Sequence, residues 1–355
     1  MMWILLACGV GFLSWWLTDR LAGKASSLGP IDHPNDRSLH HRPTPRTGGI
    51  AIVVSASCGL LVWTIMLFVF QPGLPGHVEH FSELTAIVLG TLFLAVVSFL
   101  DDRHELPVLM RFGFHLVAAC GVVFGGNVVV HSLLVPGLGT IDLGWSAPLL
   151  TLAFLMWMTN LYNFMDGMDG FAGGMTVAGF GLMGYFFWIG HHPVLFGVSV
   201  IQAAAATGFL VHNFPPAKIF MGDVGSISTG FLAGSLIVLG CRESTFDLWV
   251  PLMVFSPFVL DATITLLGRA LRLEKVWRAH REHYYQMLVL SGWSHRRTVL
   301  AEYAVMALCG ILAVLYQQAA EGWRVIILGV WIVLFLALAG LASRLQGGTR
   351  IEAGT

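Results

Sequence analysis

The sequence predicts an all-α integral membrane protein, a polytopic helical bundle with about eleven transmembrane helices. Of its 355 residues, 56% are hydrophobic and only 11% are charged, whereas a soluble domain carries about 25% charged residues. Apolar segments also recur along the chain, and their length is close to the roughly 20 residues that a spanning helix requires. The formal net charge of −1, with no basic tail, gives no indication of a nucleic-acid partner, and we set that class aside.

The predicted spans follow one another with short connections. They lie at 2–22, 48–70, 83–100, 112–131, 146–164, 173–190, 194–212, 225–241, 249–268, 299–319 and 324–343. The least distinct are the two within 173–212 and the glycine-rich span that starts at Gly225. Because no repeat or soluble segment interrupts the series, we expect residues 1–355 to form a single membrane-embedded domain.

Basic residues fall mainly on one side of the predicted bundle. Of the 19 Lys and Arg residues, 17 follow odd-numbered spans or lie in the C-terminal tail; the exceptions are Arg242 and Arg324. Lys and Arg are enriched in cytoplasmic loops. The N-terminus is therefore predicted to lie outside and the C-terminus in the cytoplasm.

Four polar, acid-containing stretches interrupt the apolar sequence, and each follows an odd-numbered span. They cover residues 99–107, 160–170, 214–226 and 280–286. All four are therefore predicted on the cytoplasmic face. Carboxylates at membrane depth are costly and are usually functional. Acids, a lysine and histidines on one face predict a metal-assisted enzyme that acts on a charged substrate at the lipid boundary.

Asp101 and Asp102 form an acidic pair at the cytoplasmic end of the third span, with Glu105 nearby. A lone Asp here would be read as a solvated helix end. Adjacent carboxylates repel each other, which favours a bound cation or a raised pKa on one of them. One acid could then act as a base while another group holds metal.

The 160–170 stretch repeats a polar side chain at every third position: Asn160, Asn163, Asp166 and Asp169. On an unbroken helix of 3.6 residues per turn, the first and last of these would point in opposite directions. Gly167 and Gly170 are expected to end the helix and to let both acids turn toward one site. A simple helix cap would not require two amides and two acids.

The 214–226 stretch combines a diproline, Lys218, and Asp223 between glycines just before a helix. A helix N-terminus offers free N–H groups to phosphate, and Lys218 adds a positive charge. Asp223 could also hold Mg²⁺, which takes one or two carboxylates together with substrate phosphates. An ordinary N-cap is the alternative.

The last stretch contains His280, Arg281 and His283 in the longest polar loop. Zinc is disfavoured because no Cys or third His accompanies the histidine pair. We expect these residues to contact phosphate or sugar hydroxyls. The alternative is a plain basic cytoplasmic loop.

Taken together, these residues resemble a known family, the polyprenyl-phosphate N-acetylhexosamine-1-phosphate transferases. The resemblance covers about residues 30–290 and depends on five motifs in order: Pro43-Thr-Pro-Arg-Thr-Gly-Gly49, Asp101-Asp102, Asn160-x-x-Asn163-x-x-Asp166-Gly-x-Asp169-Gly170, Pro216-Ala-Lys-x-Phe-Met-Gly-Asp223-x-Gly-Ser226 and His280-Arg-x-His283-x-Tyr-Gln286. It implies ten or eleven helices around a cytoplasmic cleft in the bacterial inner membrane. It also implies transfer of a sugar 1-phosphate from a UDP-N-acetylhexosamine to undecaprenyl phosphate, with release of UMP.

The resemblance also implies roles for individual residues. Asp166 and Asp223 would hold Mg²⁺, for which Mn²⁺ could substitute. Asp101 would deprotonate the lipid phosphate with Asp102 beside it, and His283 would contact the donor. Further substrate contacts are expected from Asn163, Asp169, Lys218, Arg111, His280 and Arg281.

The histidine motif departs from the consecutive histidines of the peptidoglycan branch of this family. It is more similar to the branch that starts O-antigen and related lipopolysaccharide or cell-wall polysaccharides, which favours a simple UDP-N-acetylhexosamine as donor. The sequence leaves open the sugar itself and the oligomeric state, for which a homodimer is one possible arrangement. It also leaves open whether the lipid phosphate attacks directly or an Asp first acts as a covalent nucleophile. An ion-coupled membrane transporter is the main alternative function, but it would place ionisable residues near mid-span.

Overall fold

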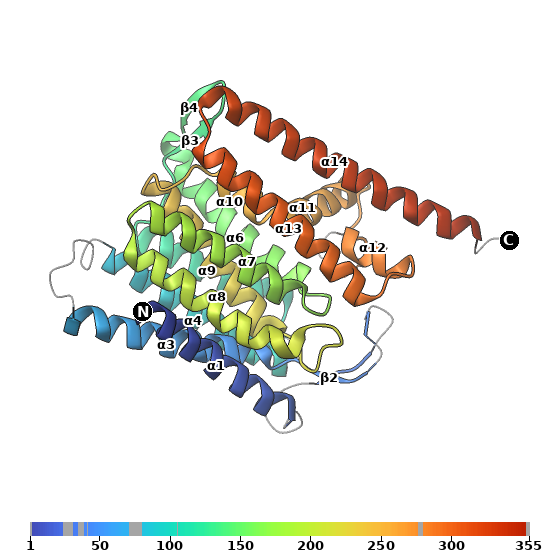
Figure 1. Cartoon of the computed structure of the whole chain (residues 1–355), viewed down its shortest axis with the longest axis horizontal. Coiled ribbons are helices and arrows are strands. Elements are labelled where there is room, and N and C mark those ends of the chain that lie inside the picture. Colours follow the sequence, from blue (N-terminus) through green and yellow to red (C-terminus); the bar gives the residue numbers. More distant parts are fainter. Residues whose placement is uncertain are drawn as a thin grey trace.

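Long apolar helices make up the computed structural model, which describes residues 2–23, 31–34, 39–40, 42–70, 80–104, 106–275 and 280–352. The helices are α1 (Met2–Gly23), α3 (Gly48–Phe70), α4 (Phe81–His104), α5 (Val108–Cys120), α6 (Ala147–Met165), α7 (Phe171–Ile189), α8 (Pro193–Asn213), α9 (Gly222–Arg242), α10 (Trp249–Val254), α11 (Ser256–Leu271), α12 (Tyr284–Leu290), α13 (His295–Gln318) and α14 (Glu321–Glu352). Their arrangement is shown in Figure 1.

Within these described ranges, nine helices are long and apolar enough to cross a membrane. The prediction of a polytopic helical membrane protein is therefore confirmed. The other two predicted spans correspond to α6 and to the pair α10 and α11. Helix α6 has 19 residues, and Asn160 and Asn163 lower its hydropathy.

Two predicted spans differ from the observed helices by a break or by a change of helix type. The span predicted at 249–268 is not one helix, because α10 and α11 meet at Phe255. Pro257 in the first turn of α11 lacks the N–H that a continuous helix would need there. The span predicted at 112–131 begins earlier, at Val108, and ends in a π-helical turn at Gly121–Gly125.

Two small antiparallel hairpins accompany the helices. Strands β1 (Ile31–Asp32) and β2 (Thr44–Pro45) pair with Ile31 opposite Pro45. Strands β3 (Ser132–Val135) and β4 (Gly139–Asp142) pair with Ser132 opposite Asp142. The second hairpin follows α5 and occupies the end of the bundle opposite to the first.

Helix α9 forms the centre of the bundle and packs against α3, α4 and α6. Nearly all of its side chains are buried, and many are Gly, Ser or Ala. Small residues let membrane helices approach closely. The approach is tightest at Gly49 of α3, where a Cβ atom would lie 2.1 Å from the backbone nitrogen of Gly225.

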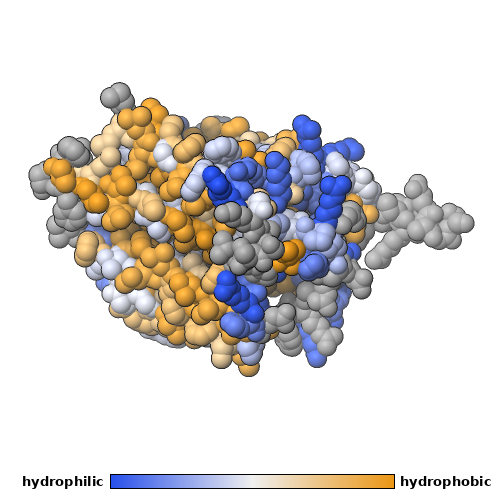
Figure 2. Space-filling model, turned by 90° about the horizontal axis from the view of Figure 1, so that it is seen from below, coloured by the Kyte–Doolittle hydropathy of each residue, from blue (hydrophilic) through white to orange (hydrophobic). Residues whose placement is uncertain are grey.

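The outer surface agrees with a membrane location. Large apolar side chains on α1, α3, α4, α13 and α14 are exposed, and orange hydrophobic residues cover much of the face in Figure 2. Blue hydrophilic side chains gather toward the right-hand end, which in Figure 1 carries α12 and β2. The polar stretches identified in the sequence lie at this end.

Candidate active site

A backbone frame brings the loop before α3 to the start of α9. The N–H of Phe220 donates to Pro45 O at 2.7 Å, and the N–H groups of Gly48 and Gly49 donate to Phe220 O and Met221 O at 3.0 and 2.8 Å. Gly222 has a φ of +68°, and a Cβ atom there would lie 2.3 Å from Arg46 O. Only glycine fits this contact, and it places Arg46 beside the first turn of α9.

Arg46 lies among the side chains of what we call the carboxylate cluster, namely Asp102, Asp166 and Asp223. Its Nη2 is 3.4 Å from Asp223 Oδ1, and it also interacts electrostatically with Asp102 and Asp166. Asn163 donates from Nδ2 to Asp223 Oδ1 at 2.9 Å and contacts Ser226 Oγ at 3.1 Å. The structure thus brings together residues from four sequence motifs.

The carboxylate cluster places three acids around one basic side chain. Desolvation by the surrounding protein raises the pKa of Asp166 well above its ordinary value, and the charges of Asp223 and Asp102 raise it further while Arg46 opposes them. For Arg46, desolvation acts against the charged form, but the neighbouring carboxylates hold its pKa above the ordinary value. A site of this kind favours a further cation.

The donor set of the carboxylate cluster fits a divalent cation that is shared with a substrate. Among the residues that the structure describes, no three His, Cys, Asp or Glu side chains are placed to hold a metal ion by themselves. Mg²⁺, however, is usually bound through one or two carboxylates plus substrate phosphates and waters. Asp166 and Asp223 supply two carboxylates and match that requirement.

The two members of the Asp101–Asp102 pair have different surroundings. Asp101 is buried, accepts a hydrogen bond from the N–H of Leu106 at 2.7 Å, and lies 3.3 Å from Arg111 Nη1. Asp102 is partly exposed and acts on the charges of Arg46 and Asp166. Asp102, and not Asp101, is therefore the acid of this pair that lies near Arg46 in the carboxylate cluster. Glu105 lies outside the described residues.

The predicted break in the 160–170 stretch is present, but its two acids go to different places. Helix α6 ends at Met165, and α7 begins after Gly170, which is left-handed with a φ of +75°. Asp166 joins the carboxylate cluster. Asp169 instead accepts a hydrogen bond from the N–H of Ala217 at 3.0 Å and lies 3.3 Å from His295 Nδ1.

The loop from Phe214 to Met221 is held by its backbone. Asn213 accepts from the N–H of Gly170 at 2.9 Å and donates to Ile219 O at 2.9 Å. The N–H of Lys218 donates to His212 O at 2.9 Å, while the Lys218 side chain is exposed. Its ammonium group is accessible to a phosphate.

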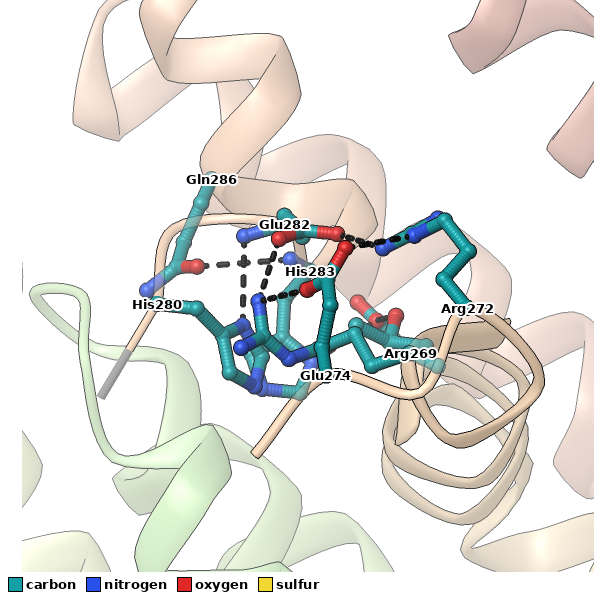
Figure 3. Close-up of polar contacts among 9 residues, drawn as sticks. Arg269, Arg272, Glu274, His280, Glu282, His283 and Gln286 are labelled. Atoms are coloured by element: carbon teal, nitrogen blue, oxygen red, sulfur yellow. Dashed lines mark hydrogen bonds and ion pairs between the residues drawn. The ribbon is translucent and has the colours of Figure 1, made fainter. Parts of the chain in front are cut away.

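The histidine motif is fastened to α11 by ion pairs, shown in Figure 3. Arg269 and Arg272 at the end of α11 both bind Glu282, and they also pair with Glu274 at 3.0 and 2.8 Å. Burial lowers the pKa of the neighbouring His280 to about 4, and the charges of His283 and Arg269 add to this effect. His280 is therefore neutral near pH 7. Arg281 is partly buried in the same loop.

His283 is buried and pairs with Asp261 rather than with the carboxylate cluster. The distance from His283 Nδ1 to Asp261 Oδ1 is 3.0 Å. The next turn approaches the Asp166 loop through Tyr285, because a Cβ atom at Gly167 would lie 2.2 Å from the Tyr285 hydroxyl. The histidine motif and the 160–170 stretch are therefore neighbours.

Four residues of this site had no role assigned from the sequence: Arg46, Asn213, Asp261 and His295. Arg46 lies inside the first of the five family motifs, but the motif alone assigns it no role. Asp261 could have been noticed as an acid within an otherwise apolar span, which usually marks function. His295 and Asn213 lie at helix ends and carry no comparable signal.

Comparison with known proteins identifies the family. The model described as glycosyl transferase family 4 matches residues 84–241, a range that contains the carboxylate cluster. A probable undecaprenyl-phosphate N-acetylglucosaminyl 1-phosphate transferase of Bacillus subtilis (strain 168) is 30% identical over 315 residues, covering 88% of this chain and 82% of that protein. The chain belongs to glycosyl transferase family 4.

Other relatives in glycosyl transferase family 4 have related activities. A decaprenyl-phosphate N-acetylglucosaminephosphotransferase of Mycolicibacterium smegmatis is 30% identical over 359 residues, covering 94% of this chain and 87% of that protein. A phospho-N-acetylmuramoyl-pentapeptide-transferase of Halalkalibacterium halodurans is 28% identical over 290 residues, covering 76% and 82%. The resemblance seen in the motifs is confirmed, and the chain is a multi-pass membrane transferase.

Proposed function

We propose that this enzyme transfers an N-acetylhexosamine 1-phosphate from a UDP-sugar to undecaprenyl or another polyprenyl phosphate. An oxygen of the lipid phosphate attacks the donor phosphorus that carries the sugar. A phosphoanhydride bond forms to the lipid, the phosphoanhydride bond to UMP breaks, and a polyprenyl diphosphate sugar is produced. The proposal agrees with the activities for which the relatives are named.

The observation that carries this proposal is the convergence of Asp102, Asp166 and Asp223 on Arg46 at the N-terminal end of α9. Phosphoryl transfer needs positioning and charge stabilisation more than covalent help from the protein. Asp166 and Asp223 would hold Mg²⁺, which would supply positive charge to the phosphoryl oxygens.

The remaining groups have roles that follow from their surroundings. Arg46 and exposed Lys218 offer positive charge to the diphosphate. Asn163 holds Asp223 in place through its amide. Asp102, rather than buried and ion-paired Asp101, is the acid available to receive a proton from the lipid phosphate. A phosphomonoester with a second pKa near 6 is mostly dianionic at neutral pH, so this proton transfer contributes little near pH 7.

The proposal extends to location and pathway. We place the site at the cytoplasmic face of a bacterial inner membrane, because this end of the bundle carries the basic loops. The motif from His280 to Gln286, in which two residues separate the histidines, supports a simple UDP-N-acetylhexosamine donor. It also supports a role in starting O-antigen or a related surface polysaccharide.

The test is to incubate purified protein with undecaprenyl phosphate, Mg²⁺ and a panel of UDP-N-acetylhexosamines, and to identify the nucleotide product. Release of UMP together with a lipid diphosphate sugar is the expected result. UDP would indicate ordinary glycosyl transfer instead. Absence of either nucleotide with every donor would refute the proposal and return attention to transport.

Parallel reactions with EDTA, and with Mn²⁺ in place of Mg²⁺, test the cation. Activity that persists in EDTA would contradict a metal shared with the donor. Omission of the lipid phosphate, which should abolish UMP release, separates transfer from hydrolysis of the donor.

A further inference from the structure

One carboxylate in the apolar helix α11, Asp261, organises the start of the histidine motif. It is only 7% exposed. Asp261 Oδ1 lies 3.0 Å from His283 Nδ1 and accepts the N–H of Tyr284 at 3.1 Å, while Oδ2 accepts the N–H of Tyr285 at 3.4 Å. Thr265, one turn later on α11, donates its hydroxyl to Oδ1 at 3.1 Å. The buried carboxylate of Asp261 thus contacts two backbone N–H groups, one imidazole and one hydroxyl.

The imidazole of His283 is constrained from other directions as well. Its ring stacks on Tyr285 with centroids 5.9 Å apart and an interplanar angle of 12°, and its backbone N–H donates to Gln286 Oε1 at 3.3 Å. A carboxylate accepts but cannot donate, so His283 must carry a proton on Nδ1 to bond with Asp261. The nitrogen that can face a substrate is then Nε2.

The first turn of α12 also contacts the loop that carries Asp166 of the carboxylate cluster. Tyr285 lies against Gly167, the residue after Asp166, and interacts electrostatically with Asp166. A shift of the first turn of α12 would therefore move the His283 ring and the contact with the Asp166 loop together. Asp261 holds both through the backbone N–H groups of Tyr284 and Tyr285.

We propose that Asp261 is a positioning residue for the transfer reaction, because it fixes the tautomer and direction of His283 so that Nε2 faces the donor. This inference rests on the proposed function and on the expected contact between His283 and the UDP-sugar. A residue that only capped α12 would make the two backbone contacts without controlling the imidazole, so tests must separate these roles.

The first test is kinetic and uses Asp261→Asn in the full-length protein. Asn keeps the size and one acceptor oxygen but loses the charge that favours a proton on Nδ1. Whichever way the amide is turned, its NH₂ group faces an N–H group that the carboxylate accepted. We expect kcat/KM for the UDP-sugar to fall about 10- to 100-fold, as for other groups that orient a functional histidine, with the KM for lipid phosphate unchanged. Asp261→Asn should add little to the loss caused by His283→Ala.

The control is Asp247→Asn. Asp247 lies near the start of α10, at the opposite end of the bundle, and also accepts a backbone N–H and a side-chain donor, from Trp249 at 3.0 Å and from Tyr316 at 3.0 Å. This variant should keep wild-type kinetics. If Asp261→Asn also keeps wild-type kcat/KM, or if its effect multiplies that of His283→Ala, the positioning role is refuted.

The second test does not depend on activity. Nitrogen-15 NMR of histidine-labelled wild-type protein, with the His283→Ala spectrum used for assignment, reports which ring nitrogen carries the proton when the ring is neutral. A proton on Nδ1 supports the inference and a proton on Nε2 overturns it. If no donor yields UMP while Nδ1 is protonated, the proposed function fails but the Asp261–His283 pairing stands.

Discussion

Replacing Asp223 by Asn should separate catalysis from stability. The change keeps the size of the side chain and the Oδ1 acceptor that Asn163 contacts at 2.9 Å, but it removes the charge beside Arg46. If Asp223 shares a cation with the donor diphosphate, turnover should fall at least about a thousandfold. That fall corresponds to about 4 kcal/mol of transition-state stabilisation, which is within the several kcal/mol expected of a metal contact.

The stability of the folded protein should change far less. At the 3.4 Å separation between Arg46 Nη2 and Asp223 Oδ1, the attraction is about 5 kcal/mol at an effective dielectric constant of 20. This is an upper value, because the Arg46 side chain is 36% exposed. Removing the charge also relieves repulsion from Asp102 and Asp166, which continue to attract Arg46. We therefore expect the free energy of unfolding to change by no more than about 1 kcal/mol.

The assay is UMP release over a Mg²⁺ titration, combined with thermal unfolding in detergent. Asp142→Asn, in the exposed hairpin strand β4 at the other end of the bundle, is the control and should behave like wild type. More than about a tenth of wild-type turnover in Asp223→Asn at saturating Mg²⁺ would refute metal binding by this residue. Strong destabilisation with retained activity would refute the charge argument.

Three further predictions address packing, topology and pH. Gly167→Ala should lower the free energy of unfolding by about 1–3 kcal/mol and reduce turnover, because its Cβ would displace the hydroxyl of Tyr285. In a variant without native cysteines, an impermeant maleimide applied from outside should label Trp145→Cys, 86% exposed, but not Leu273→Cys, 93% exposed. The pKa of His280, about 4 in the fold against an ordinary 6.5, means that the unfolded chain binds a proton first. Stability should therefore decline as the pH falls from about 6.5 toward 4, and less steeply in His280→Gln.

Each of these predictions has a matched comparison. Gly113→Ala in α5, where no atom lies within 4 Å of the new Cβ, should stabilise the helix by about 0.5–1 kcal/mol; equal effects at both glycines would contradict the packing argument. Labelling of residue 273 from outside would show that the predicted orientation is reversed. If the stability of wild type and of His280→Gln declines equally as the pH falls, His280 is not kept neutral by the fold.

The class of fold could be predicted from the sequence because spanning helices leave a strong hydropathy signal. Two boundaries could not be predicted from hydropathy. The break at Phe255 separates two apolar helices with no charged residue at the junction, so only Ser256 and Pro257 mark it. The end of the fourth span is hidden because the β-branched residues after Gly126 are as apolar as a helix would be.

The site could be predicted only as a set of residues, not as a set of partners. Spacing identified Asp101 and Asp102 together, but which of the two acids faces the carboxylate cluster depends on the geometry of the last turn of α4 and on Arg111. Asp166 and Asp169 were expected to share a site, and the left-handed turn at Gly170 directs them differently. Long-range pairings such as Asp261 with His283 have no local pattern to reveal them.

The backbone frame between residues 45–49 and 220–221 has a consequence for engineering. Its hydrogen bonds join main-chain atoms, so they do not depend on the side chains that the same loop presents to solvent. Pro216 and Lys218 are exposed within this loop and can be exchanged without dismantling the support of Arg46. Because Lys218 offers charge to the donor diphosphate, a substitution there should weaken donor binding without moving Arg46. The contribution of this contact can then be measured separately from that of the frame.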